Sequence, residues 1–306
     1  MILCAGEALI DMLPRRTAEG EDAFAPHAGG AVFNTAVALG RLGAETGYFG
    51  GLSTDFMGDL LDRALVHSRV DTHLCVRSSR PTTLAFVRLV DGQASYAFYD
   101  EGTAGRMLDP AALPALPDDV GALFLGGISL IPEPCGTAYE TLMAREAETR
   151  VTMIDPNIRT GFVTDEAGYR ARLERMIGMA DIVKLSDEDM TWLLGEGHVS
   201  DRAGEILAMG PTLVFVTEGG RGARGYTARH EVKLHAEEVA VVDTVGAVDT
   251  FYAGNLAELQ RAGLLSKPAL AQLSRGAIEA ALSLAIRAAA VTVSRAGANP
   301  PWAHEI

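Results

Sequence analysis

Short apolar runs alternate with helix-like segments through the second half of the chain, and this alternation constrains the fold more than any other feature. Between the first two runs, residues 134–148 are predicted to form a helix. Strands separated by helices are typical of βαβ units, so we expect a parallel sheet covered by helices. The four predicted strands, rich in apolar and β-branched residues, occupy positions 122–125, 151–155, 182–185 and 213–217.

The chain is long and apolar enough to bury a substantial core. It has 306 residues, of which 48% are hydrophobic, and its sequence contains no internal repeat or low-complexity tract. This length fits one large domain, or one domain with an appendage. The segment 270–293 is Ala-rich, but Arg275, Glu279 and Arg287 interrupt it, so we expect a core helix and not a membrane span.

Charge and cysteine content argue against several partners and compartments. The formal net charge of −14 disfavours binding to nucleic acid or to anionic membrane surfaces. Cys4, Cys75 and Cys135 are odd in number and too widely spaced for a disulfide framework or a metal site. The first residues carry no basic segment, and Glu7 comes too early for a secretory signal. We therefore expect a protein of the reducing cytoplasm.

A glycine-containing turn at 243–249 joins a predicted strand to a predicted helix. The β-branched run 239–242 is expected to be a buried strand, and residues 251–257 a helix. Small residues in such a turn let backbone N–H groups at the helix start converge on an anion. Asp249 lies at the same point, where it could cap the helix or take a proton from a hydroxyl that attacks a phosphoryl group. The spacing alone leaves both interpretations open.

A second glycine-containing turn lies near the N-terminus. Residues 2–9 are predicted to form the first strand, and Asp11 follows at the edge where open α/β sheets bind ligands. Gly29 and Gly30 precede a predicted helix that carries Asn34 in its first turn. Paired glycines let a ligand approach the backbone closely, and an Asn side chain can both donate and accept hydrogen bonds.

Between these two turns the periodicity changes. Residues 83–89 and 95–99 are strand-like, and Asp91-Gly92 between them is a strong hairpin signal. A β-hairpin is therefore expected in this part of the chain.

The two glycine-containing turns carry motifs that resemble the signatures of ribokinase-like sugar kinases. The C-terminal motif is Asp-Thr-x-Gly-Ala-x-Asp-x-Phe at 243–251, and the N-terminal motif is Gly-Gly-x-x-x-Asn at 29–34. The resemblance implies one domain over residues 1–306, with a three-layer α/β/α core, a mostly parallel central sheet and a small β-sheet lid. It implies lid segments near 11–28 and 75–104, whose closure would keep water from the reaction.

For catalysis, the resemblance implies that Asp249 is the general base and that the amides of Gly246, Ala247 and Val248 stabilise charge on the γ-phosphoryl group. The family usually has glycine where this chain has Val248. A positive φ would strain valine by more than about 1 kcal/mol, whereas an ordinary helical φ would keep its amide available. We expect the helical φ.

For the sugar, the resemblance implies contacts from Asp11, Gly29, Gly30, Asn34 and Arg159. The stretch 98–108 is most similar to bacterial fructokinases, and that similarity implies that Phe98 shapes the sugar pocket and Arg106 reaches the sugar hydroxyls. Without it, Phe98 and Arg106 would be interpreted as a packing residue and a surface charge.

For the nucleotide, the resemblance implies contacts from Asn157, Ser186, Thr217, Gly219, Gly222 and Asn299. Asn157 and Arg159 belong to an Asp-Pro-Asn-x-Arg motif that follows a predicted strand. ATP would bind without a P-loop lysine, because no G-x-x-x-x-G-K-[ST] pattern occurs in the sequence.

Metal ions are implied by the same resemblance. Glu188 and Asp189 are implied to order Mg²⁺ and phosphate through water, although Ser186 followed by acids is also an ordinary helix N-terminus. The backbone around Asp243 and the C-terminal tail are implied to hold a monovalent cation such as K⁺.

The similarity to bacterial fructokinases implies ATP-dependent phosphorylation of D-fructose to fructose 6-phosphate. A 2-keto-3-deoxygluconate kinase is an alternative, since Arg88, Arg106 and Arg159 could bind an acid, and a ribokinase-type activity is another. A sugar- or nucleotide-binding regulator without turnover, suggested by Val248 and Ser186, belongs to a different class. A Rossmann dehydrogenase is disfavoured because no G-x-G-x-x-G follows the first strand. The implied partners are a small-molecule sugar and ATP, and the exposed edge of the lid could pair with a second subunit.

Overall fold

The computed structural model describes residues 1–90 and 93–306, and the side chains of residues 1–87 and 97–306. Its core is a nine-stranded sheet in the order β15-β14-β13-β12-β11-β10-β1-β4-β6. The seven strands from β13 to β6 run parallel, and the β14–β15 hairpin adds two antiparallel strands at one edge. The bounds are β1 Ile2–Ala5, β4 Thr46–Phe49, β6 Val70–Asp71, β10 Ala122–Gly126, β11 Val151–Asp155, β12 Ile182–Ser186, β13 Leu213–Thr217, β14 Ala223–Tyr226 and β15 Glu231–Leu234.

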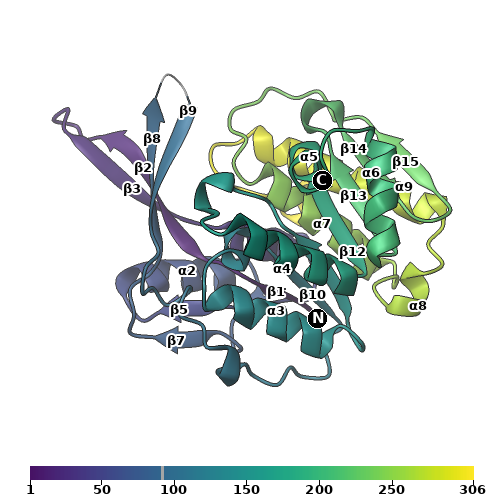
Figure 1. Cartoon of the computed structure of the whole chain (residues 1–306). Helices are drawn as coiled ribbons and strands as arrows, with labels where there is room; N and C mark the ends of the chain where they lie inside the picture. The colour runs from purple at the N-terminus through teal and green to yellow at the C-terminus, as the bar shows by residue number, and fades with distance from the viewer. Residues whose placement is uncertain (91–92) are drawn as a thin grey trace.

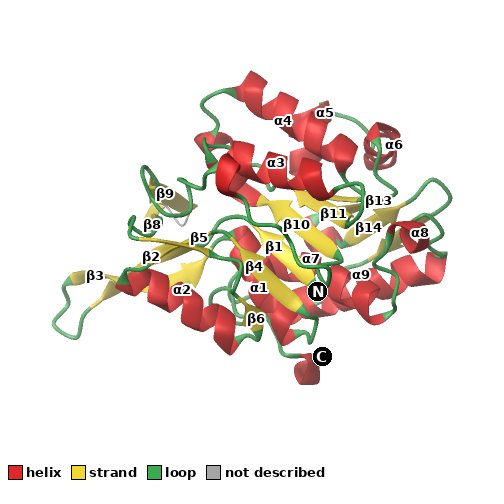
Figure 2. Cartoon of the chain, turned by 90° about the horizontal axis from the view of Figure 1, so that it is seen from below, coloured by secondary structure: helices red, strands yellow, loops and turns green. Residues whose placement is uncertain are grey.

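Helices cover both faces of this sheet (Figure 2), which confirms the predicted three-layer core. Within β11, Val151 and Met153 pack on one face and Ile154 on the other, as expected for a strand buried on both sides. The helices on the first face are α1 Ala31–Arg41, α2 Phe56–His67, α7 Ala247–Arg261 and α9 Arg275–Val293. Those on the second are α3 Cys135–Glu146, α4 Glu166–Met179, α5 Asp187–Leu194 and α6 Val199–Met209.

A second, four-stranded sheet projects from the core as the lid (Figure 1). Its order is β3-β2-β8-β9, with β2 and β8 parallel and the other two pairs antiparallel. The predicted hairpin is present as β8 and β9, while its Asp91-Gly92 turn lies outside the described residues. The bounds are β2 Leu9–Arg16, β3 Asp22–Gly29, β8 Leu84–Val90 and β9 Gln93–Tyr99, and a short parallel pair is formed by β5 Gly51–Ser53 and β7 Val76–Ser78.

The first core strand is shorter than predicted. β1 ends at Ala5, and the next three residues carry the chain from the core sheet into the lid strand β2. Asp11 therefore lies within the lid sheet, opposite His27 of β3 and Ala85 of β8. A Cβ on Gly6 would overlap Val32 of α1, so the crossing passes directly against the start of that helix.

The predicted buried strand at 239–242 is wrong. Residues 235–241 have no regular structure, and Val241 and Val242 are 65% and 63% exposed. The backbone N–H groups of Val242 and Asp243 donate to the carbonyl of Val293 at the end of α9. β-branched residues favour an extended backbone, but an extended segment becomes a buried strand only beside a partner strand, and here the neighbour is a helix end.

The helix predicted at 270–293 is present as α9, Arg275–Val293, and begins five residues later than expected. α8 spans Lys267–Leu270, and α9 begins after Ser274, whose hydroxyl accepts the Ala277 N–H. In the described part of the chain, α9 is the one helix whose length and composition would let it cross a membrane. It packs along α7 and beside β14 and β15. Its inner face, completely buried, consists of Ile278, Ala281, Leu282, Ala285 and Ala288, as expected for a core helix.

Candidate active site

The predicted site residues gather at the carboxyl edge of the core sheet, where β11, β12 and β13 end side by side at Asp155, Ser186 and Thr217. The first turns of α1 and α7 meet at the same edge, because a hydrogen bond joins Asn34 to Asp249. Motifs more than 200 residues apart in the sequence therefore form one site.

The start of α7 is shaped to receive an anion. Gly246 precedes the helix in the left-handed region, at φ 77°, and a Cβ there would come 2.9 Å from the Cα of Ala298. The first i→i−4 bond of the helix runs from Thr250 N–H to the Gly246 carbonyl. The backbone N–H groups of Val248 and Asp249 donate to no acceptor among the described residues, so they are available to bind an anion.

Two details of this turn refine the prediction. Val248 lies in the first turn of α7 and has no positive φ, which confirms the helical conformation expected for it. The Ala247 N–H donates to the Thr244 carbonyl at 3.3 Å, so this amide is partly engaged within the turn itself. Of the three predicted amides, those of Gly246 and Val248 thus donate to no described residue, and the Asp249 N–H is a further available group.

Asp249 has the environment of a general base. Its side chain is 7% exposed, and burial raises its pKa to about 7, despite the hydrogen bond from Asn34. The Asn34 Nδ2 donates to Asp249 Oδ2 at 2.9 Å, and no other described residue donates to this carboxylate. The second oxygen, Oδ1, can therefore accept a proton from a substrate hydroxyl near neutral pH.

The paired glycines bring the lid close to the core. A Cβ on Gly29 would overlap the Asp11 carboxylate, and a Cβ on Gly30 would lie 2.9 Å from the Glu7 carbonyl. Gly30 also has φ 109°, where other residues are strained. Burial raises the pKa of Asp11 to about 6. Asp11, Gly29, Gly30 and Asn34 thus lie together, as predicted for one ligand-binding surface.

Glu7 is a site residue that the sequence reasoning missed. It is 9% exposed, and its carboxylate accepts the N–H groups of Ala31, at 3.0 Å, and Ser129, at 3.3 Å. Burial raises the pKa of Glu7. A Cβ on Gly127 would overlap this carboxylate. The sequence signal was an acidic residue just after a buried strand. Burying a carboxylate is costly unless hydrogen bonds satisfy it.

The loop after β11 carries Asn157 and Arg159. Asn157 has φ 42°, and its N–H donates to Asp155 Oδ1 at 3.1 Å. The next N–H, of Ile158, donates to Asp189 Oδ1 at 2.9 Å. Two buried carboxylates therefore fix the loop, and Arg159 is close enough to Asp155 and Asp249 for its charge to lower the pKa of each, against the larger effect of burial.

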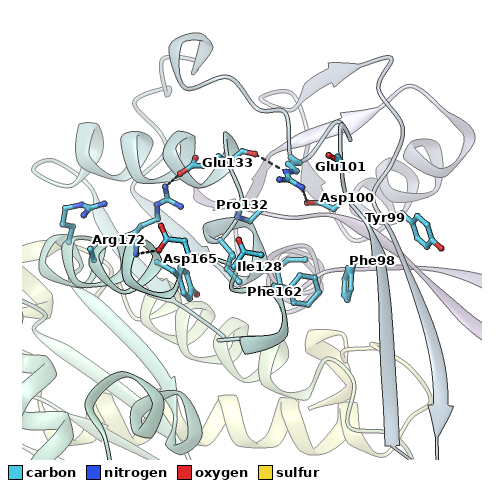
Figure 3. A pocket seen from close by; sticks show the side chains of 17 residues that line it. Phe98, Tyr99, Asp100, Glu101, Ile128, Pro132, Glu133, Phe162, Asp165 and Arg172 are labelled. Carbon is cyan, nitrogen blue, oxygen red and sulfur yellow. Dashed lines mark hydrogen bonds and ion pairs between the residues drawn. The ribbon is translucent and has the colours of Figure 1, made fainter.

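Phe98 and Arg106 line a cleft of about 870 Å³ between the lid and the core (Figure 3). The ring of Phe98 meets that of Phe162 edge to face, with centroids 4.2 Å apart. The Arg106 Nε donates to the Glu133 carbonyl at 3.1 Å. Arg106 also borders a small cavity that Glu7 lines, so the cleft reaches the Glu7 side of the site.

The predicted nucleotide-binding residues lie on the loops beyond β12 and β13. Gly219 and Gly222 have positive φ, and a Cβ on Gly222 would overlap the Leu234 carbonyl. The hairpin is held by Arg224, whose Nε is 2.9 Å from Glu218 Oε2. The tail reaches the start of α7, because Ala298 lies against Gly246, and the next side chain, Asn299, accepts a hydrogen bond from Arg41 of α1 at 2.8 Å.

The residues predicted to bind metal ions are engaged with the backbone. Asp189 Oδ2 accepts the Ser186 N–H and Oδ1 accepts the Ile158 N–H, while Glu188 is exposed. Asp189 thus has the capping role expected of an acid at a helix N-terminus. The Asp243 carboxylate accepts the N–H groups of Val245 and Gly297, and so ties the turn before α7 to the tail. Among the described residues, no group of three or more His, Cys, Asp or Glu side chains could hold a metal ion.

Comparison with known proteins identifies the family of this chain. The pfkB family carbohydrate kinase model matches residues 1–305. A fructokinase of Rhizobium leguminosarum bv. trifolii is 55% identical over 278 residues, covering 91% of this chain and 85% of that protein.

Two solved structures share the fold. The fructokinase of Xylella fastidiosa with bound ATP has a TM-score of 0.88 and 29% identity, covering 97% of this chain and 93% of its own. The fructokinase of Vibrio cholerae O395 in its fructose, ADP and calcium ion bound form has a TM-score of 0.83 and 25% identity, covering 97% and 94%. The resemblance predicted from the two motifs is confirmed, and the chain belongs to the pfkB family of carbohydrate kinases, with a ribokinase-like fold.

Proposed function

We propose that this kinase transfers the γ-phosphoryl group of ATP to the primary hydroxyl of D-fructose, giving fructose 6-phosphate and ADP. One observation carries the proposal: a buried carboxylate, Asp249, with one oxygen held by Asn34 and the other available, beside the unpartnered N–H groups that begin α7. The 55% identity to a bacterial fructokinase supports fructose as the acceptor.

In this mechanism, Asp249 takes the proton of the acceptor hydroxyl as its oxygen attacks the γ-phosphorus. The bond from phosphorus to the bridging oxygen of ADP breaks, and charge develops on the transferred group. The N–H groups of Val248 and Asp249, together with the α7 dipole, stabilise that charge. A base with a pKa of about 7 is well matched to proton transfer near neutral pH.

The sugar would lie between the lid and the core. Asp11 and Asn34 can bind its hydroxyls, and Gly29 and Gly30 let it approach the backbone. Arg106 and Phe98 border the neighbouring cleft between lid and core, and the charge of Arg159, on the β11 loop, acts on Asp249. Holding one hydroxyl in line with the phosphoryl group supplies much of the rate enhancement in such reactions.

The nucleotide would lie over Thr217, Gly219 and Gly222, with Asn157, Ser186 and Asn299 at its border. Mg²⁺ would arrive with ATP and neutralise phosphate charge. Because the described residues offer no cluster of ligands, the phosphates and water would supply most of its coordination. A monovalent cation such as K⁺ would be held by backbone carbonyls around Asp243 and the tail.

We further propose a cytoplasmic homodimer that forms through the lid. Cys4, Cys75 and Cys135 are all free, in keeping with a reducing compartment. The lid sheet leaves β3 and β9 as edge strands, and its exposed Phe24 and Tyr99 flank Phe86, with ring centroids 5.0 and 5.5 Å from it. Unpaired edges and exposed aromatic rings are features of association surfaces.

A kinetic screen of fructose, ribose and 2-keto-3-deoxygluconate with coupled detection of ADP tests the substrate. We expect the highest kcat/KM with fructose, and a preference for the acid would overturn this assignment. The cations of the cleft argue against the acid, because Arg172 is paired with Glu133 and Glu140, and Arg106 lies 4.0 Å from Asp100. Of the other two predicted cations, Arg159 acts on Asp155 and Asp249, and the Arg88 side chain lies outside the described side chains.

The same assay separates an enzyme from a regulator without turnover. Fructose binding without ADP production would favour the regulator. The features that suggested it do not disable the site, since Val248 keeps a helical φ and Ser186 caps α5.

A further inference from the structure

Lys184 lies in the middle of the core at a position where an apolar residue would be expected. It occupies β12, is completely buried, and its Nζ has no hydrogen-bond partner among the described residues. Its nearest carboxylate oxygen is Asp155 Oδ1, at 4.0 Å. Its Nζ also lies 4.3 Å from the centroid of the Tyr252 ring.

This burial does not serve stability. Removing an ammonium group from water costs several kcal/mol, and a single ion pair at long distance without hydrogen bonds repays little of that cost. On the neighbouring strand β13, the residue in register with Lys184 is Phe215, which packs in the apolar core. Burial lowers the pKa of Lys184 and raises that of Asp155 to about 7, and each charge partly offsets the other's shift.

Lys184 lies between two parts of the catalytic site, the 155–159 loop and the first turn of α7. Asp155 accepts the N–H of Asn157, which is held in the strained left-handed region just before Arg159. Tyr252 lies three residues after Asp249, on the same side of α7. The Lys184 ammonium is thus placed between the carboxylate that shapes the Arg159 loop and the helix that carries the base.

We propose that Lys184 is a positioning residue for phosphoryl transfer: through Asp155 and the Tyr252 ring it fixes the 155–159 loop against the first turn of α7, so that Arg159 and Asp249 act on the same acceptor hydroxyl. This inference rests on the proposed kinase reaction. The charged groups that act on Lys184 are Asp155 from β11, Asp189 from α5, Asp249 from α7 and Arg159 from the loop.

The test replaces Lys184 with methionine, which keeps the unbranched stem and removes the charge. We expect Lys184→Met to lower kcat by about tenfold or more and to raise the KM for fructose several-fold, because small displacements of positioned groups are costly. The KM for ATP should stay within about twofold. The variant should fold, with a lower melting temperature than the wild type, because Asp155 stays buried without its counter-charge. Lys233→Met, at an exposed position on β15, is the matched control and should behave as the wild type.

A double-mutant cycle asks whether Lys184 acts through Asp155. If it does, Asp155→Asn and the double variant should lose about as much kcat as Lys184→Met alone. Losses that multiply in the double variant would overturn the proposal, as would a folded Lys184→Met enzyme with kcat and the KM for fructose within about twofold of wild type.

Two further outcomes are distinguishable. If Lys184→Met does not fold, Lys184→Gln is measured instead, and failure of both variants to fold would assign Lys184 to stability and contradict the proposal. If the wild type phosphorylates none of the sugars tested, the proposed reaction fails. An active wild type with unchanged variants would refute only the role of Lys184.

Discussion

The two ends of the proposed site differ in burial. Asn34 and Asp249, which would face the sugar, are 9% and 7% exposed, whereas Val241 and Val242, which lead into the anion-binding turn and would form the nucleotide end, are 65% and 63% exposed. The first pair lies in the opening turns of two core helices and is joined by a hydrogen bond. The second pair lies in and beside an irregular segment that the end of α9 holds by one carbonyl.

The difference follows from what each end must do. Proton transfer needs donor and acceptor atoms fixed to a fraction of an ångström, and buried, fully packed side chains supply that. A nucleotide base instead needs an apolar surface that it can cover on arrival, and we expect the exposed valines before the α7 turn to supply it. Mutations at the sugar end should therefore change kcat, and those at the nucleotide end should change the KM for ATP.

The largest effect is expected from Asp249→Asn. It should lower turnover by at least about 10²-fold, the usual scale for loss of a general base, while ATP binding measured by calorimetry stays largely intact. Asp201→Asn, an exposed carboxylate in the first turn of α6, is the matched control. Turnover that survives in Asp249→Asn would remove the assigned base.

The pH dependence should report the same carboxylate. The base acts when ionised and its pKa in the free enzyme is about 7, so kcat/KM for fructose should fall about tenfold for each pH unit below 7. Asp11, with a pKa of about 6, should steepen the fall at lower pH, and Asp11→Asn should abolish that extra slope. A profile flat down to pH 5 would contradict both assignments.

Gly246→Ala should lower kcat/KM for ATP by about tenfold. Alanine at φ 77° is strained, and its Cβ would press on Ala298, which displaces the start of α7 from the tail. Gly263→Ala is a close control, because Gly263 also has positive φ but no atom lies within 4 Å of the added Cβ. Equal kinetic losses in both variants would mean that backbone strain alone, and not the anion site, is responsible.

The smallest effect is expected from Val242→Ser at the nucleotide end. It should raise the KM for ATP about two- to fivefold, the scale of one partly covered apolar side chain, and leave kcat unchanged. Val66→Ser, on an equally exposed valine of α2, should change neither. A change in kcat without a change in the KM for ATP would contradict the different roles expected for the two ends.

The parts of this architecture with local signatures could be predicted from the sequence. Gly30 and Gly246 have positive φ, a backbone requirement that is local to each turn, so their motifs indicated the site directly. The alternation of strands and helices predicted the parallel core. Val248 was also predicted, because a helical φ accommodates valine where a positive φ would not.

The parts that depend on distant partners could not be predicted. The valines of 239–242 favour an extended backbone, but whether they are buried depends on a neighbouring strand that the fold does not provide. The hydrogen bond that Asp189 accepts from Ile158 could not be predicted, because Ile158 comes from another loop. The role of Lys184 could not be predicted from the strand alone, since its contacts with Asp155 and Tyr252 exist only after three elements pack together.

Helix α1 begins beside the lid at Gly30 and ends at Arg41, whose guanidinium binds the side chain of Asn299 and the carbonyl of Pro300. Asn299 and Pro300 are thus hydrogen-bonded to the same helix that positions Asn34 beside Asp249. Removal of residues 299–306 should consequently disturb α1 and the position of Asn34, and so weaken sugar binding far from the deletion. A purification tag should therefore follow Ile306 and not replace these residues.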